Sequence, residues 1–160
     1  MLYSFARVGA MLGTKVEDYY HRGKRGWLRL HEKGGRFHEV PLHHQAEEYL
    51  DAYLAMAGIT GAKGAFLFQA VDSSKMAVTG AAIGRRGVLA RVKRVVSLLE
   101  LHDGVCNHSF RATGITLFRK AGGSLDKARI LAGHASTKTT QVYDHSGDDI
   151  SASEVERIII

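Results

Sequence analysis

The sequence predicts a mainly helical α+β domain with a small antiparallel β-hairpin sheet. Apolar residues recur at helical spacing over most of the chain. Between residues 27 and 42, two strand-like segments flank a pair of glycines, as in a hairpin. The chain has 160 residues, which is enough for one domain with a substantial core and too few for two ordinary ones.

The first elements are expected in the order helix, extended segment, hairpin. Residues 1 to 12 carry apolar side chains at helical spacing, and Gly13 is a natural C-terminal stop. A short extended stretch is expected near residues 16 to 20. The hairpin follows between residues 27 and 42, because Gly34-Gly35 supplies the backbone freedom that a tight turn requires.

The middle of the chain predicts two helices separated by a loop. From residue 42 to Gly58, apolar residues form one helical stripe. Residues 58 to 80 are rich in glycine, serine and small side chains, so we expect a loop there, with a short buried piece at residues 65 to 68. Valines and leucine at helical spacing then predict an amphipathic helix over residues 88 to 99.

The C-terminal third predicts three further helices that glycines separate. They are expected at about residues 109 to 121, 125 to 132 and 136 to 143. Residues 153 to 160 could form a last short helix that ends in three isoleucines.

Composition excludes several classes of protein. An apolar content of 45% is typical of a globular protein, and no apolar run approaches the roughly 20 residues that span a bilayer. The start lacks the pattern of a signal peptide. The single cysteine, Cys106, cannot form an internal disulfide, which fits a reducing cytoplasm. We interpret Cys106 as a small filler and not as a nucleophile.

The charge distribution predicts a polyanionic partner. The net charge is +6 and the pI is about 9.6. Basic residues are concentrated between residues 22 and 36 and again between residues 85 and 94, where no acid lies among them. Either group alone could be an ordinary solvated face, but together they favour contacts with the phosphates of a nucleic acid. The residues predicted to make these contacts are Lys24, Arg25, Arg36, Arg85, Arg86, Arg91, Lys93 and Arg94.

Three short motifs in the last third carry the chemistry. His108-Ser-Phe-Arg111 places a histidine and an arginine three positions apart, on one face of a helix. Gly133-His134 and Tyr143 follow on two expected short helices, close enough in sequence to return to that face. Such a set suits a tyrosine that attacks a phosphodiester held by cations. Each residue alone could instead be structural, for example Tyr143 as a packing aromatic.

These motifs resemble those of the tyrosine recombinase, or integrase, family. The family carries H-x-x-R, G-H and a terminal tyrosine, and the spacing of nine positions from His134 to Tyr143 also matches. The segment over residues 2 to 13 resembles the family's first arginine helix, and residues 27 to 42 resemble its β-hairpin. The resemblance implies the tyrosine recombinase catalytic-domain fold and six catalytic residues: Arg7, Lys33, His108, Arg111, His134 and Tyr143.

One position departs from the family pattern. The family usually has an acidic residue three positions after its first arginine, and this chain has Ala10 there. We therefore expect Arg7 to lack that acidic partner.

The resemblance also implies a mechanism. A tyrosine has an unperturbed pKa of about 10, so it needs cations such as Arg7 and Arg111 to favour the phenolate. Lys33 would protonate the leaving 5′-oxygen, and the two histidines would hold the phosphate and shuttle the proton of the nucleophile. A covalent 3′-phosphotyrosine retains the bond energy, so no cofactor is expected. The histidine spacing also predicts no metal site.

The resemblance implies double-stranded DNA as the partner, on which the chain would act as a homo-oligomer. No membrane partner is expected. We expect a protein of the cytoplasm, associated with the nucleoid, from a prokaryote, a phage or a mobile element. Residues 1 to 145 would form the catalytic domain, with the family's N-terminal core-binding domain absent. Residues 146 to 160 would form a tail that contacts a neighbouring protomer through an apolar stripe.

Two other functions stay open at this point. The chain could be a DNA-binding remnant, disabled by truncation and by Ala10. It could also be a phosphate- or RNA-handling enzyme of unrelated fold. The latter is disfavoured because the sequence has no Gly-rich nucleotide loop and no carboxylate pair for a metal.

Overall fold

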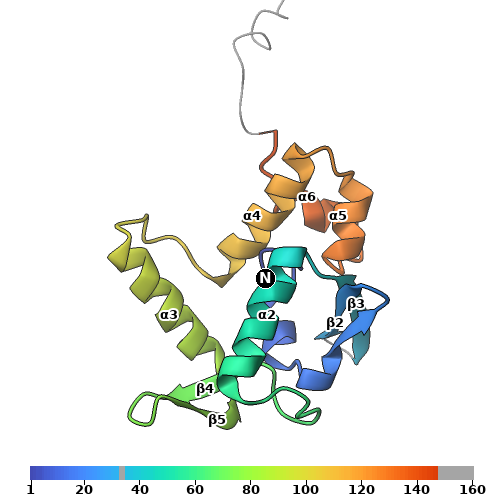
Figure 1. Cartoon of the computed structure of the whole chain (residues 1–160). Coiled ribbons are helices and arrows are strands. Elements are labelled where there is room, and N and C mark those ends of the chain that lie inside the picture. The colour runs from blue at the N-terminus through green and yellow to red at the C-terminus, as the bar shows by residue number, and fades with distance from the viewer. Residues whose placement is uncertain (33–34, 148–160) are drawn as a thin grey trace, which may run out of the picture.

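The fold is an assembly of helices around two small antiparallel sheets, which confirms the predicted α+β class (Figure 1). The computed structural model describes residues 1–32 and 35–147. In these residues the elements are α1 (Val8–Leu12), the 3-10 helix η1 (Val16–Asp18), β1 (Tyr19–Arg22), β2 (Arg25–Glu32), β3 (Arg36–Pro41), α2 (His44–Ala57), β4 (Gln69–Asp72), β5 (Ala77–Ala82), α3 (Arg85–Leu98), α4 (Asn107–Lys120), α5 (Leu125–Leu131) and α6 (Thr137–Gln141).

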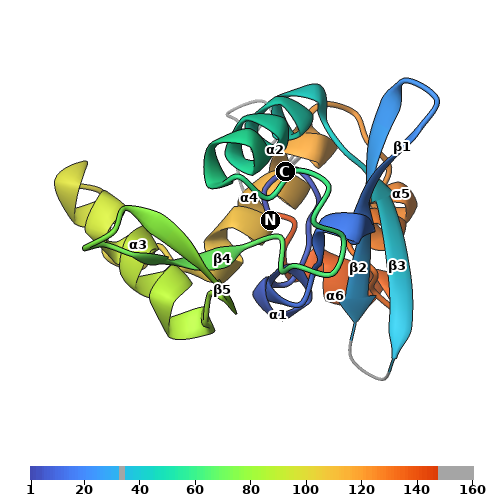
Figure 2. The same ribbon diagram turned by 60° about the horizontal axis from the view of Figure 1, so that its bottom comes forward.

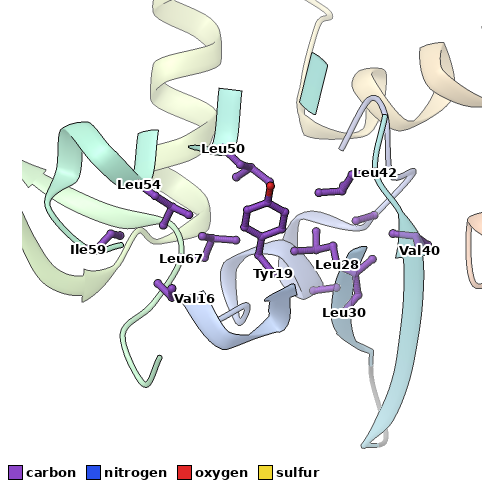
Figure 3. Close-up of a cluster of buried hydrophobic side chains, with 12 residues drawn as sticks. Val16, Tyr19, Leu28, Leu30, Val40, Leu42, Leu50, Leu54, Ile59 and Leu67 are labelled. Carbon is purple, nitrogen blue, oxygen red and sulfur yellow. The ribbon is translucent and has the colours of Figure 1, made fainter. Parts of the chain in front are cut away.

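The main core lies on one face of the three-stranded sheet, whose strand order is β1-β2-β3. Alternation along β2 points Leu28 and Leu30 inward, and Leu28 is paired with Val40 of β3. Figure 3 shows these side chains packed with Leu50 and Leu54 of α2 and with residues of the following loop. Burial of this one face fixes the register of the strands, because a slip by one residue would expose every core side chain.

A second, smaller core joins the start of the chain to the C-terminal helices. Phe5 packs with Ile115 of α4 and with Ala128 and Ala132 at α5, and Tyr143 lies against this group. In Figures 1 and 2, α3 lies on one side of the molecule and the three-stranded sheet on the other, with α1 and α4 between them. The two cores therefore place α1 and α4 at the centre of the molecule.

The first helix is shorter than the sequence predicts. It covers only Val8–Leu12, and the backbone of Phe5 has a positive φ of 50°, which interrupts helical geometry. The cause is tertiary. The chain before α1 lies directly on α4, where the carbonyl of Phe5 accepts a hydrogen bond from Arg111. A regular helix would have used that carbonyl internally.

Gly114 permits this close contact. A Cβ at this position of α4 would overlap the Leu2 carbonyl oxygen and lie 3.0 Å from Cδ1 of Phe5. We expect Gly114→Ala to lower the free energy of unfolding by about 1–3 kcal/mol, because the backbone must shift to accept the methyl group. Urea unfolding would measure the loss. Gly64→Ala is the control, since its Cβ would meet no atom within 4 Å; equal losses in both variants would contradict this explanation.

The prediction of a loop over residues 58 to 80 is wrong for the last part of this range, where the structure has the hairpin β4-β5. The turn of this hairpin depends on specific side-chain hydrogen bonds, which amino-acid composition does not reveal. Oδ1 of Asp72 accepts from the backbone of Ser74, and Met76 takes a positive φ of 50°. The buried side chain of Gln69 bonds the backbone of Phe66 and Gly80, bridging the irregular register of the strands.

The extended stretch expected near residues 16 to 20 is wrong for Val16–Asp18, which form the 3-10 helix η1. The backbone N–H of Lys15 donates to Oδ2 of Asp18 and closes this turn. Strand β1 begins only at Tyr19.

The remaining predicted elements are present, with ends shifted by a few residues. The hairpin strands, α2 with its left-handed cap at Gly58, and helices α3 to α6 all form. The predicted helix over residues 153 to 160 lies outside the described residues. In the part of the chain that the structure covers, no helix is long and apolar enough to cross a membrane.

Candidate active site

Arg111 lies at the centre of the site, on the second turn of α4, and is only 1% exposed. Its guanidinium donates to the carbonyl of Phe5, to the carbonyl of Ala132 at 2.7 Å, and to Nε2 of His134. Burial, and then the charge of Arg7, lowers the pKa of Arg111 to about 10, so it remains charged at neutral pH. Three of its five N–H groups serve the protein, and the buried Nε–H has no partner among the described residues.

His134 is held as a neutral acceptor. It follows Gly133, whose positive φ of 60° ends α5 in a left-handed turn. Arginine can only donate, so Nε2 of His134 must accept from Arg111, and Nδ1 must carry the proton that it shares with Thr140 Oγ1 at 2.9 Å. Burial, followed by the charges of Arg111 and Arg7, lowers the pKa of His134 to about 4.

Tyr143 packs against these groups just after α6. Its ring stacks on His134 with centroids 5.5 Å apart, and Cζ of Arg111 lies 5.4 Å from its centroid. The ring of His108 is 6.4 Å from that of Tyr143. The backbone is fixed as well, because Oγ1 of Thr116 donates to the carbonyl of Tyr143 at 3.3 Å. The tyrosine is thus surrounded by one arginine and two histidines.

Arg7 approaches the same group from the N-terminal side. It caps the start of α1, and its charge lowers the pKa of both Arg111 and His134, so the three residues share one electrostatic environment. Nη1 of Arg7 donates to Oε2 of Glu32 at 3.0 Å. Ala10 was expected to leave Arg7 without its acidic partner; the structure corrects this, because a strand far away in sequence supplies one.

The remaining predicted residue, Lys33, lies outside the described residues. Its chain neighbour Glu32 is the last residue of β2 and bonds Arg7. The end of β2 that leads to Lys33 is therefore beside Arg7. The structure brings together five of the six predicted catalytic positions, and the sixth directly follows one of their partners.

The predicted DNA-contacting residues are all exposed, but they form more than one surface. Lys24 and Arg25 lie where β2 begins, whereas Arg36 pairs with Glu32 where it ends. At about 3.3 Å per residue, these ends are roughly 20 Å apart. The basic residues of α3 lie on the other side of α1 and α4 (Figure 2).

Two residues of the site were missed by sequence reasoning, Glu32 and Thr140. Thr140 is fully buried and lies one helical turn before Tyr143. A polar residue one turn before the tyrosine on a short helix was the available signal. For Glu32 the sequence offers only its position next to Lys33.

Thr140→Val keeps the shape of the side chain but removes the acceptor for Nδ1–H of His134. We expect the free energy of unfolding to fall by about 1–3 kcal/mol, because a buried donor loses its partner. Thr140→Ser keeps the hydroxyl and is the matched control. Chemical unfolding of both variants measures the difference; a serine variant less stable than the valine variant would contradict the role of this hydrogen bond.

The fold and the site together define a class, and comparison with known proteins agrees. The model of the Phage integrase family matches residues 1–149, and the chain belongs to this family. Its fold is that of tyrosine recombinase catalytic domains. The structure of the XerA recombinase aligns with a TM-score of 0.73 at 19% identity, covering 97% of this chain and 52% of that one. A lambda integrase dimer bound to a COC' core site aligns with a TM-score of 0.69 at 22% identity, covering 99% and 43%.

Curated relatives are tyrosine recombinases. XerC of Pelobacter propionicus is 33% identical over 139 residues, which are 87% of this chain and 43% of the relative. XerD of Corynebacterium glutamicum is 28% identical over 156 residues, or 95% and 47%. The chain therefore spans less than half the length of these relatives.

Proposed function

We propose that this chain is the catalytic domain of a site-specific DNA recombinase that cuts and rejoins strands through a covalent 3′-phosphotyrosine at Tyr143. One observation carries the proposal. The ring of Tyr143 contacts a charged, buried arginine and a neutral histidine, with a second histidine beside it.

The buried arginine would act through fixed electrostatics. Arg111 is held by two backbone carbonyls and His134, so its position costs no reorganisation when negative charge develops on a phosphate. Its charge also lies against the ring of Tyr143, with Cζ 5.4 Å from the ring centroid.

The two histidines would take different roles. His134 has a pKa of about 4 and uses both ring nitrogens within the protein, so it orients Arg111 and supplies no proton at neutral pH. His108 is exposed and stacks beside Tyr143, which makes it the better acceptor for the tyrosine proton.

Lys33 would protonate the leaving 5′-oxygen, as the family resemblance implies. This role is supported by the residue before Lys33 in the sequence, Glu32, which contacts Arg7. We propose no metal and no cofactor in the reaction, because a phosphotyrosine retains the energy of the broken bond.

The partner we propose is double-stranded DNA, bound by several copies of the protein. One solved relative is described as a dimer bound to a core site, and another, XerH, as bound to its palindromic difH substrate. Residues 1 to 145 would be the catalytic domain and residues 146 to 160 a tail that contacts a neighbouring copy; residues 148–160 lie outside the described part. With DNA as the substrate, we propose that the protein acts in the cytoplasm, associated with the nucleoid, and comes from a prokaryote, a phage or a mobile element.

A suicide DNA substrate tests the proposal. A nick near the cleavage site lets the short 5′-hydroxyl strand diffuse away, which traps the covalent adduct. A denaturation-resistant, protease-sensitive adduct is expected. Reversible binding alone would instead support a disabled DNA-binding remnant, and no binding at low salt would reject DNA as the partner.

A further inference from the structure

The contact of Arg7 with Glu32 is partly shielded from solvent. The Glu32 side chain is 13% exposed and that of Arg7 is 40% exposed. Within residues 1–32 and 35–147, Glu32 is the one side chain to which Arg7 forms a hydrogen bond. A long, half-exposed arginine has many conformations, and this carboxylate selects one of them.

The side chain at position 10 of α1, three residues after Arg7, cannot hold the guanidinium in this way. Ala10 is 4% exposed and packs in the main core, so its methyl group has no polar contact to offer. Glu32 reaches Arg7 from β2, whose register with β3 is fixed through the pairing of Leu28 with Val40. The carboxylate therefore belongs to a strand whose register is set by the core.

We propose that Glu32 is a positioning residue, which holds the guanidinium of Arg7 beside Arg111 and His134 in place of the acid that is missing at Ala10. This inference rests on the proposed function. The same ion pair joins the end of β2, one residue before Lys33 in the sequence, to the start of α1.

The ion pair leaves most of the Arg7 guanidinium available to a phosphate. Among the described residues, the bond from Nη1 of Arg7 to Oε2 of Glu32 is the one side-chain hydrogen bond of this guanidinium, and it uses one of the five N–H groups. The second carboxylate oxygen, Oε1, is buried without a hydrogen-bond partner among the described residues. In a bidentate pair, two N–H groups of the guanidinium would point at the carboxylate. The single hydrogen bond fixes the orientation of the guanidinium and leaves its other N–H groups for the ligand.

The test measures adduct formation on the suicide substrate together with reversible DNA affinity. Glu32→Gln keeps the shape of the side chain and removes its charge. We expect the rate of adduct formation to fall by about 10- to 100-fold, since a misplaced group costs about this much. Reversible affinity should change little. Glu39→Gln is the matched control, because Glu39 pairs with Arg22 and Arg29 in the same sheet; it should keep the unaltered rate.

The Arg7→Ala background separates positioning from a merely structural role. If Glu32 acts through Arg7, Glu32→Gln should slow the reaction no further in that background. An equal loss in both backgrounds, or a Glu32→Gln variant that reacts as fast as the unaltered protein, would overturn the inference. Absence of an adduct from the unaltered protein would instead reject the proposed function. Thermal unfolding confirms that each variant is folded.

Discussion

Tyr143→Phe is expected to abolish the covalent DNA adduct while leaving reversible DNA binding almost unchanged. The substitution removes the attacking oxygen but no positive charge. The ring also keeps its packing, because the stack on His134 and the contact with Arg111 involve its faces and not its hydroxyl. Denaturing gels of the suicide-substrate reaction measure the adduct, and a gel shift measures affinity.

A tyrosine elsewhere on the molecule serves as the control. Tyr49 on α2 is 65% exposed, so Tyr49→Phe should form the adduct at the unaltered rate. An adduct that survives in Tyr143→Phe at the unaltered level would show that another residue is the nucleophile.

Arg111→Ala is expected to lower both the free energy of unfolding and the rate of adduct formation. The substitution leaves the carbonyls of Phe5 and Ala132 and Nε2 of His134 without their buried donor. We expect the free energy of unfolding to fall by about 2–5 kcal/mol, which is a large part of the stability of a typical domain. Adduct formation should fall by at least about a hundredfold, because a preorganised donor to the phosphate is lost.

Arg111→Lys tests geometry apart from charge. Lysine keeps the positive charge, but its single ammonium cannot match three acceptors that a planar guanidinium reaches. The Arg111→Lys variant should therefore also be less stable and form the adduct more slowly. Arg22→Lys on β1 is the control, because the Arg22 side chain is half-exposed and its ion pair with Glu39 lies near the start of β2, at the opposite end of that strand from Glu32. An Arg111→Lys variant as stable and as active as the unaltered protein would contradict the fixed-donor role.

Urea unfolding and adduct assays on these variants together separate folding from chemistry. If Arg111 served only the fold, adduct formation by the folded fraction of Arg111→Lys would equal that of the unaltered protein. If it served only the phosphate, the stability of the variant would be unchanged. We expect both quantities to fall, since the same guanidinium joins the N-terminal segment to α4 and faces Tyr143.

Local patterns in the sequence predicted most elements, and the misses have physical causes. The hairpin β2-β3 and helices α2 to α6 follow from periodicity, glycine positions and caps, which act over a few residues. The segment before α1 did not, because its geometry depends on Arg111 and on the absence of a side chain at Gly114. The hairpin β4-β5 depends on side-chain bonds of Asp72 and Gln69 that composition conceals.

The sequence by itself determined which residues could form the site, because H-x-x-R spacing and the order of His134 and Tyr143 are local properties of a chain. Only the tertiary structure decided their chemical state. His134 is neutral because folding buries it beside Arg111, and Arg7 gains an acidic partner because folding brings Glu32 to it. Burial and charge proximity between distant segments arise only when the chain folds, so no spacing rule contains them.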